Sequence, residues 1–214
     1  MRYKYIFFDL DGTLTDPKEG ITKCVQYALD FYGIHEETDN LLNFIGPPLV
    51  DSFMEFYGFS EDKALAAVEK YRERFAKIGI FENKVYDGVC EMLQKLTDSG
   101  RVPVLATSKP KVFADVIVKK FRLRPYLKMV SGSELDGTRN NKDEVIEYAL
   151  KKLGCPVESV IMVGDRRQDI IGAKKCGVAS CGVRFGYAEP IELEEAGADY
   201  IVNSIDELTE LLMQ

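Results

Sequence analysis

Acidic side chains directly follow two apolar runs of the sequence. Asp9 and Asp11 come after Tyr5-Ile6-Phe7-Phe8, and Asp165 comes after a second run and Gly164. Like charges this close together are costly unless a cation or hydrogen-bond donors compensate them. Carboxylate oxygens suit Mg²⁺, a hard cation. The carboxylates of Asp9, Asp11 and Asp165 therefore indicate a divalent-cation site.

Two of the acidic residues, Asp11 and Asp169, also have a structural interpretation. Asp-Gly is a common turn dipeptide, which explains Asp11-Gly12 but leaves the charge of Asp9 unexplained. Asp169 alternatively caps the helix that it precedes. Asp165 is harder to explain as a structural residue.

Hydroxyl and ammonium groups follow another apolar run, at Thr107-Ser108-Lys109-Pro110. These groups can hold phosphate oxygens, and Pro110 is expected to open a helix whose first N–H groups favour anions. The alternative is an ordinary helix N-cap formed by Thr107 or Ser108.

Lys142 is expected in the first turn of a helix, where its charge opposes the helix dipole by about a few tenths of a kcal/mol. That unfavourable position suggests a functional lysine. Asp143 and Glu144 offset the charge, so a solvated surface lysine is the alternative.

Alternating strands and helices must position these side chains. Strands are predicted at 4–9, 102–106, 127–131, 159–163, 179–183 and 200–202. Helices are predicted at 87–98, 111–121, 142–153, 169–176, 191–196 and 205–213. This alternation indicates an α/β fold with a parallel sheet covered by helices on both faces. Such sheets bind ligands at the carboxyl ends of their strands, where the residues above lie.

Residues 20–79 have a different pattern, with apolar side chains at helical spacing and no strand. Ser60 is expected to cap one helix, and Gly46-Pro47-Pro48 divides the segment into two helix pairs. The segment therefore reads as a small all-helical unit.

Composition limits the classes of partner. The net charge is −7 with no basic block, which excludes a nucleic acid polymer as the expected partner. The longest apolar runs are only strand-length, so no membrane partner is expected. The first residues run straight into a strand pattern without a signal peptide, and the cysteines are scattered, which favours a cytoplasmic protein with reduced thiols. His35 is the single histidine, which argues against histidine-based hydrolysis.

Together these motifs resemble the haloacid dehalogenase (HAD) superfamily. Asp9-Leu10-Asp11-Gly12-Thr13 matches its first motif, Thr107 the second, Lys142 the third, and Gly164-Asp165 with Asp169 the fourth. The resemblance covers essentially the whole chain. It implies a Rossmann-like core domain over residues 1–16 and 82–214 and an inserted helical cap domain over 17–81.

The third motif departs from the commoner Lys-Pro-x-Pro form. Residues 132–142 instead resemble a bacterial subgroup described as phosphoglycolate phosphatase-like or 5′-nucleotidase-like. Lys109 and Arg139 are alternatives to Lys142 as the main phosphate-binding cation. Arg166 stands where a small residue is common, and it would narrow the site or reach toward substrate.

The resemblance implies a Mg²⁺-dependent phosphatase in which Asp9 forms an aspartyl-phosphate. Asp11 would act as general acid and then as general base. The ion would be held by the carboxylates of Asp9 and Asp165 and the backbone carbonyl of Asp11, with Asp169 assisting. Thr107 and Lys142 would complete the catalytic residues. The expected substrate-binding residues are Thr107, Ser108, Lys109, Gly46 and Arg139.

The expected substrate is a small phosphate monoester. Phosphoglycolate, a nucleotide and a sugar phosphate all fit, and the cap would select among them. One alternative is a sugar phosphomutase similar to β-phosphoglucomutase, and another is a non-catalytic relative that binds phosphorylated ligands. A monomer or small homo-oligomer is expected.

Overall fold

The computed structural model describes residues 2–214. The chain divides into two compact units, a core unit of Met1–Asp16 with Val85–Gln214 and a helical unit of Pro17–Lys84. The sequence placed the second of these boundaries at 81/82.

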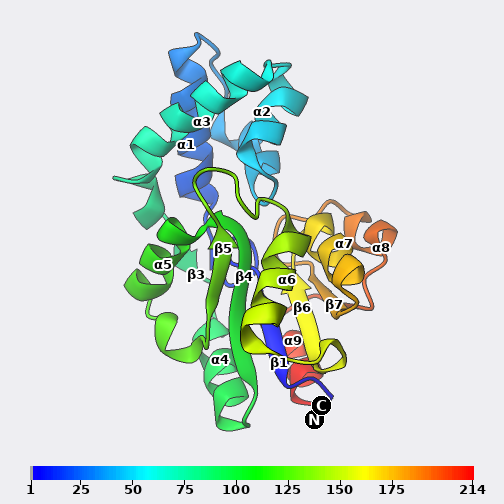
Figure 1. Ribbon diagram of the computed structural model, residues 1–214. Coiled ribbons are helices and arrows are strands. Elements are labelled where there is room, and N and C mark those ends of the chain that lie inside the picture. The colour runs from blue at the N-terminus through cyan, green and yellow to red at the C-terminus, as the bar shows by residue number, and fades with distance from the viewer. Residues whose placement is uncertain (1) are drawn as a thin grey trace. The chain divides into compact units, whose positions relative to one another are not determined.

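A six-stranded parallel sheet forms the centre of the core unit, with the strand order β5-β4-β1-β6-β7-β8 (Figure 1). Its strands are β1 (Tyr5–Phe8), β4 (Val102–Pro110), β5 (Val130–Ser133), β6 (Val160–Gly164), β7 (Ala179–Val183) and β8 (Tyr200–Val202). In the register of the sheet, Phe7 lies between Val104 of β4 and Met162 of β6. The two strands beside β1 are therefore β4, which contains Thr107, and β6, which precedes Asp165 and Asp169.

Helices cover both faces of this sheet, which is why β1 is apolar on both sides. They are α4 (Val89–Asp98), α5 (Lys111–Lys120), α6 (Lys142–Leu153), α7 (Arg167–Cys176), α8 (Glu192–Ala196) and α9 (Ile205–Met213). α6 and α7 pack against each other, and Val145, Ile146 and Ala173 bury Phe7 beneath them. Ile6 and Phe8 point to the opposite face, where α4 packs against α9, and they are fully buried.

β4 is longer than the sequence pattern predicts. The strand continues beyond residue 106 to Pro110, because the chain shifts register and pairs Pro110 with Ser133 of β5. α5 begins only at Lys111, after Pro110, and no side chain caps it. The interpretation of Thr107 or Ser108 as a helix N-cap is therefore wrong.

The helical unit contains α1 (Lys18–Phe31), α2 (Leu49–Tyr57) and α3 (Glu61–Phe75), with the short 3₁₀ helices η1 (Thr38–Phe44) and η2 (Gly79–Phe81). α1 and α2 both pack against α3. The Ser60 hydroxyl accepts a hydrogen bond from the Lys63 N–H, as expected of an N-cap. The rings of Phe44, Phe53 and Phe59 form part of the small core. The short strands β2 (Thr15–Asp16) and β3 (Lys84–Val85) form a separate two-stranded sheet.

Within residues 2–214, no helix combines the length and the apolar character that membrane crossing requires. The five cysteines are unpaired, and Cys24, Cys155 and Cys181 are buried. His35 is exposed beside Asp30.

Candidate active site

The site lies at the carboxyl end of β1, the strand between β4 and β6. Asp9 directly follows β1, and its N–H donates to the Val163 carbonyl of β6 at 2.9 Å. Asp9 and Asp11 are 4% and 8% exposed, so neither is an ordinary surface carboxylate. The chain then turns sharply, and the N–H groups of Leu14 and Thr15 both donate to the Leu10 carbonyl.

Glycines in this turn and in β6 leave room for the acidic side chains. Gly12 has a φ of +82°, and a Cβ there would lie 2.1 Å from Oδ2 of Asp165. A Cβ on Gly164 would lie equally close to the Asp169 carboxyl. Packing against carboxylates therefore requires glycine at both positions, and at Gly12 the backbone conformation requires it as well.

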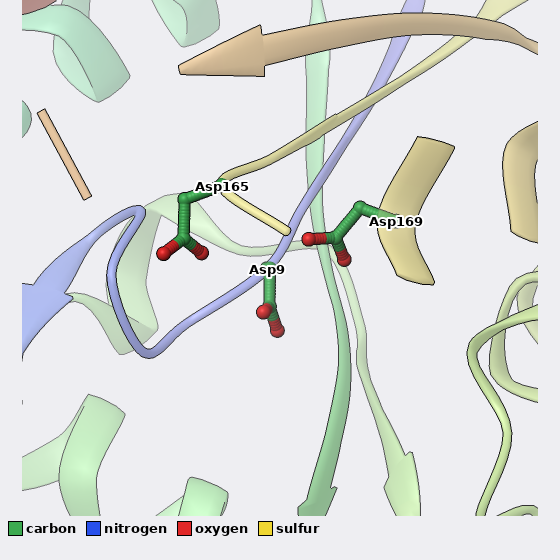
Figure 2. Close-up of side chains that lie close together, drawn as sticks. All are labelled: Asp9, Asp165 and Asp169. Atoms are coloured by element: carbon green, nitrogen blue, oxygen red, sulfur yellow. The ribbon is translucent and has the colours of Figure 1, made fainter. Parts of the chain in front are cut away.

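Asp9, Asp165 and Asp169 form a buried acidic cluster. Each offers a carboxylate oxygen, and these oxygens all lie within 4.8 Å of one another. Figure 2 shows Asp9 and Asp165 extending from loops and Asp169 from the helix α7, with the three carboxylates gathered together. The Asp11 side chain is not part of this cluster, and its proposed contribution through the backbone carbonyl stays a prediction.

Hydrogen bonds orient the two carboxylates after β6. Asp165 accepts from the Thr13 hydroxyl at 3.3 Å and from the Tyr187 N–H at 2.8 Å. Oδ2 of Asp169 accepts from the Arg166 N–H at 3.1 Å. Asp169 thus lies within the first turn of α7 and caps it from inside, rather than preceding the helix.

Burial and the charges of neighbouring carboxylates raise the pKa of Asp165 and of Asp169. Burial, followed by the charges of Asp169 and Asp9, raises the pKa of Asp165 well above its ordinary value. Burial raises the pKa of Asp169 to about 6, although Lys142 opposes the shift. A group of oxygens that repel one another in this way is suited to a hard divalent cation.

Lys142 supplies a positive charge inside the cluster. Its Nζ lies 2.8 Å from Oδ1 of Asp9 and 2.8 Å from Oδ1 of Asp169, and it donates to the Ala106 carbonyl at 3.2 Å. Burial alone would lower the pKa of Lys142, but the Asp169 and Asp9 carboxylates outweigh it and hold the pKa above its ordinary value. Lys142 is only 5% exposed, so the solvated-surface interpretation is wrong.

Lys109 pairs with Asp11 rather than with the cluster. Its Nζ lies 2.7 Å from Oδ2 of Asp11, and both side chains are nearly buried. Burial raises the pKa of Asp11, while Lys109 opposes the rise. Oδ1 of Asp11 is buried and accepts no hydrogen bond from any described residue.

Thr107 lies at the same edge of the sheet and is 2% exposed. Its hydroxyl oxygen accepts a hydrogen bond from the Lys109 N–H at 3.2 Å, near the C-terminal end of β4. The Ser108 carbonyl accepts from the Ser133 hydroxyl at 2.7 Å, which ties β4 to β5.

The other two predicted substrate-binding residues, Arg139 and Gly46, have no contact with the acidic cluster among those that the structure describes for them. Arg139 pairs with Glu134, donates to the Gly132 carbonyl at 3.3 Å and lies 4.3 Å from the centre of the Tyr148 ring. Gly46 belongs to the helical unit, where it has a φ of +107°. The contribution of either residue to substrate binding stays a prediction.

The segment after β7 also contacts the site, although no sequence pattern indicated it. In this segment, Gly186 packs against Asp165 and the Tyr187 N–H donates a hydrogen bond to it. Glu192 pairs with Arg166, the residue after Asp165, at 3.0 Å. No motif marks these residues. The available signal was topological, because β7 neighbours β6 and must end at the same edge of the sheet.

The chain is similar in sequence to a known protein family and to individual characterised proteins. Residues 6–183 match the family described as haloacid dehalogenase-like hydrolase. A 5′-nucleotidase of Pseudomonas aeruginosa is 49% identical over 194 residues, which cover 90% of this chain and 88% of that protein. The tyrosine-protein kinase PtkA of Mycobacterium tuberculosis is 32% identical over 97% of this chain and 72% of its own.

A solved structure is also closely similar. The crystal structure of a predicted phosphatase from Clostridium acetobutylicum superimposes with a TM-score of 0.97 at 48% identity, covering 100% of this chain and 99% of that one.

Proposed function

The chain belongs to the haloacid dehalogenase-like hydrolase family and is a phosphoric monoester hydrolase, and from this premise we propose that it is Mg²⁺-dependent and acts through an aspartyl-phosphate intermediate. The observation that carries the proposal is the position of Asp9. Its buried carboxylate contacts Lys142 on α6 and shares the acidic cluster with Asp165 and Asp169.

Asp9 is the nucleophile in this proposal. Its carboxylate oxygen forms a bond to phosphorus while the bond from phosphorus to the leaving oxygen breaks. The Lys142 ammonium, 2.8 Å from Asp9, stabilises the charged form and limits the repulsion of the incoming phosphate. The Thr107 hydroxyl, at the neighbouring end of β4, is proposed to bind a phosphate oxygen.

Asp11 moves the proton in both steps. The protonated carboxyl donates to the leaving oxygen as the ester bond breaks. The resulting carboxylate then accepts a proton from the water that attacks the aspartyl-phosphate, which releases phosphate and regenerates Asp9. The pKa of Asp11, raised by burial, supports its service as an acid.

The acidic cluster fits Mg²⁺ by its chemistry. Its donors are the carboxylate oxygens of Asp9, Asp165 and Asp169, and the Lys142 ammonium pairs with two of these residues, Asp9 and Asp169. Asp9 and Asp165 would hold the ion, with Asp169 in support. Bound there, Mg²⁺ would neutralise charge on the phosphoryl group.

We propose nucleoside 5′-monophosphates as the first substrates to test, since the 5′-nucleotidase is similar over most of both chains. The helical unit is proposed to serve as the cap that contacts the leaving group, with Gly46 among its contacts. We further propose that the protein is cytoplasmic and a monomer or small homo-oligomer.

Hydrolysis of p-nitrophenyl phosphate with and without Mg²⁺ tests the reaction class. Asp9→Asn should lower kcat by about three orders of magnitude or more with the fold intact, because no other group forms the covalent bond. Asp206→Asn, an exposed aspartate on α9, is the matched control and should keep wild-type rates. Appreciable activity in Asp9→Asn would remove Asp9 as nucleophile.

A panel of phosphate esters tests the substrate. Catalytic efficiencies are compared for nucleoside 5′-monophosphates, phosphoglycolate and sugar phosphates. The nucleotides should exceed the others by at least about tenfold, since this corresponds to only about 1.4 kcal/mol of differential binding. A dependence on a sugar bisphosphate activator would instead favour the phosphomutase, and no turnover with any ester would favour the binding relative.

A further inference from the structure

The segment from Gly186 to Glu192, here named the β7–α8 segment, packs directly on the proposed metal ligands. A Cβ on Gly186 would lie 2.4 Å from Cβ of Asp165 and 2.4 Å from the Gly12 carbonyl oxygen. The backbone of the segment therefore contacts both Gly12, in the turn after β1, and Asp165. Nothing larger than glycine fits at this contact.

Tyr187 holds Asp165 at one end of the segment. Its N–H donates to Oδ2 of Asp165 at 2.8 Å, and its hydroxyl donates to the Asp16 carboxylate at the end of β2. The hydroxyl contact fixes the residue whose backbone orients Asp165. Tyr187 thus connects a proposed metal ligand to the last residue of the first core segment.

Glu192 holds the turn between Asp165 and Asp169 from the other end. Its side chain is fully buried, and Oε1 accepts from the Arg167 N–H at 2.7 Å and from Nε of Arg166 at 3.0 Å. Oε2 accepts from the Glu189 N–H at 3.0 Å. One carboxylate thus joins the β7–α8 segment to the start of α7, where the Arg166 N–H binds Asp169.

We propose that Tyr187 and Glu192 are positioning residues for magnesium binding, which set the orientation of Asp165 and Asp169 without touching the ion. The inference rests on the proposed function, since it assumes that the acidic cluster binds the metal. Groups that orient ligands in this way commonly change metal affinity by about 10- to 100-fold when they are altered.

Calorimetric titration of the substrate-free protein with magnesium chloride tests the inference. Tyr187→Phe keeps the ring and the N–H but loses the anchor to Asp16, and Glu192→Gln loses one acceptor of its buried network. Both should raise the Kd for Mg²⁺ by about tenfold or more. The rate at saturating Mg²⁺ should change less than the Mg²⁺ concentration required for half-maximal rate.

Matched controls come from the same unit. Tyr200→Phe removes a hydroxyl that contacts Tyr3, and Glu207→Gln alters a carboxylate that accepts from the Asn203 N–H at the start of α9. Both should keep the wild-type Kd for Mg²⁺, even where they lower thermal stability. If Glu192→Gln fails to fold, Tyr187→Phe carries the test.

The outcomes separate two failures. Mg²⁺ affinities within twofold of wild type in folded Tyr187→Phe and Glu192→Gln would overturn this inference and leave the proposed function standing. A wild-type protein that neither binds Mg²⁺ nor requires it for hydrolysis would overturn the proposed function as well.

Discussion

At the scale of single residues, the charge of Lys142 is what allows carboxylates to be buried together. The ammonium contacts Asp9 and Asp169 at 2.8 Å each. None of these three residues is more than 5% exposed. A buried charge without a partner is far more costly than a buried pair. Lys142 therefore combines a structural role with its proposed contact to phosphate.

Removing this charge should damage both stability and turnover. Lys142→Met is expected to lower the free energy of unfolding by about 3–5 kcal/mol in metal-free buffer at pH 7, because two carboxylates lose their partner. kcat should fall by about 10²–10³-fold. Urea denaturation and steady-state kinetics measure the two effects.

Lys175→Met is the control for that change. Lys175 pairs with Asp143 at 3.1 Å on the surface, so its loss should cost less than about 1 kcal/mol and leave kcat unchanged. Equal losses in the two variants would contradict the role given to Lys142.

Gly12 offers a second test at this scale. Gly12→Ala should cost about 1 kcal/mol for its left-handed backbone and a further 1–3 kcal/mol, roughly, for overlap with Asp165. Gly177→Ala, at a φ of +68° with open space around it, should show the first cost alone. Thermal denaturation of both variants separates the costs, and equal destabilisation would mean that Asp165 moves freely aside.

Residue types after apolar runs were sufficient to predict this part of the site. Asp9, Asp165 and Asp169 meet in space because each follows or closely follows a strand of the same parallel sheet. Lys142 was ambiguous from sequence, since its burial depends on Gly172 of α7, where a Cβ would lie 3.0 Å from the lysine side chain. Such a contact between two helices leaves no local signal.

At the scale of elements, the order of strands and helices followed from hydrophobic periodicity, but the end of β4 did not. Thr107 to Pro110 lack the apolar pattern of a strand, and a proline is unusual there. They extend because β5 provides partners after a register shift, which is a long-range effect. The β7–α8 segment was missed for a related reason, because its function is carried by backbone N–H groups and one distant carboxylate.

Glu192 should make the contact between α8 and the start of α7 dependent on pH. Burial alone would raise its pKa, but the Arg167 and Glu189 N–H groups and the Arg166 guanidinium outweigh burial and lower the pKa below its ordinary value. The stabilisation is thus fully present above the unfolded-state pKa and is lost as the pH falls through the lower folded-state value.

Glu192→Gln measures this contribution. The variant should lose about 1–3 kcal/mol of unfolding free energy at pH 7, and its deficit relative to wild type should shrink as the pH is lowered below about 4.5. Urea denaturation across this range gives the difference. A deficit that stays constant with pH would show that the charge of Glu192 does not contribute.

At the scale of the whole molecule, every proposed metal ligand lies in the core unit and none in the helical unit. A ligand that binds only the folded state stabilises the part of the protein whose unfolding destroys the binding site. Mg²⁺ at 100 times its Kd should therefore stabilise the core unit by about 2.7 kcal/mol.

Hydrogen exchange followed by mass spectrometry can resolve this difference. Amides of β1 and β6 should become about 100-fold more protected with Mg²⁺, while those of α1 and α3 should change by less than about twofold. Asp165→Asn should abolish the gain in the core. Equal protection of both units would contradict the local effect and indicate that they unfold together.

The strand order has a consequence for synthesis of the protein on the ribosome. β1 lies between β4 and β6, yet it ends at Phe8, whereas β6 ends at Gly164. At about 5–20 residues per second, the nascent chain carries Ile6, Phe7 and Phe8 without their second neighbouring strand for on the order of 10–30 s. The helical unit is fully translated within that interval. We therefore expect chaperones that shield apolar segments to engage the first strand early and to release it only after β6 emerges.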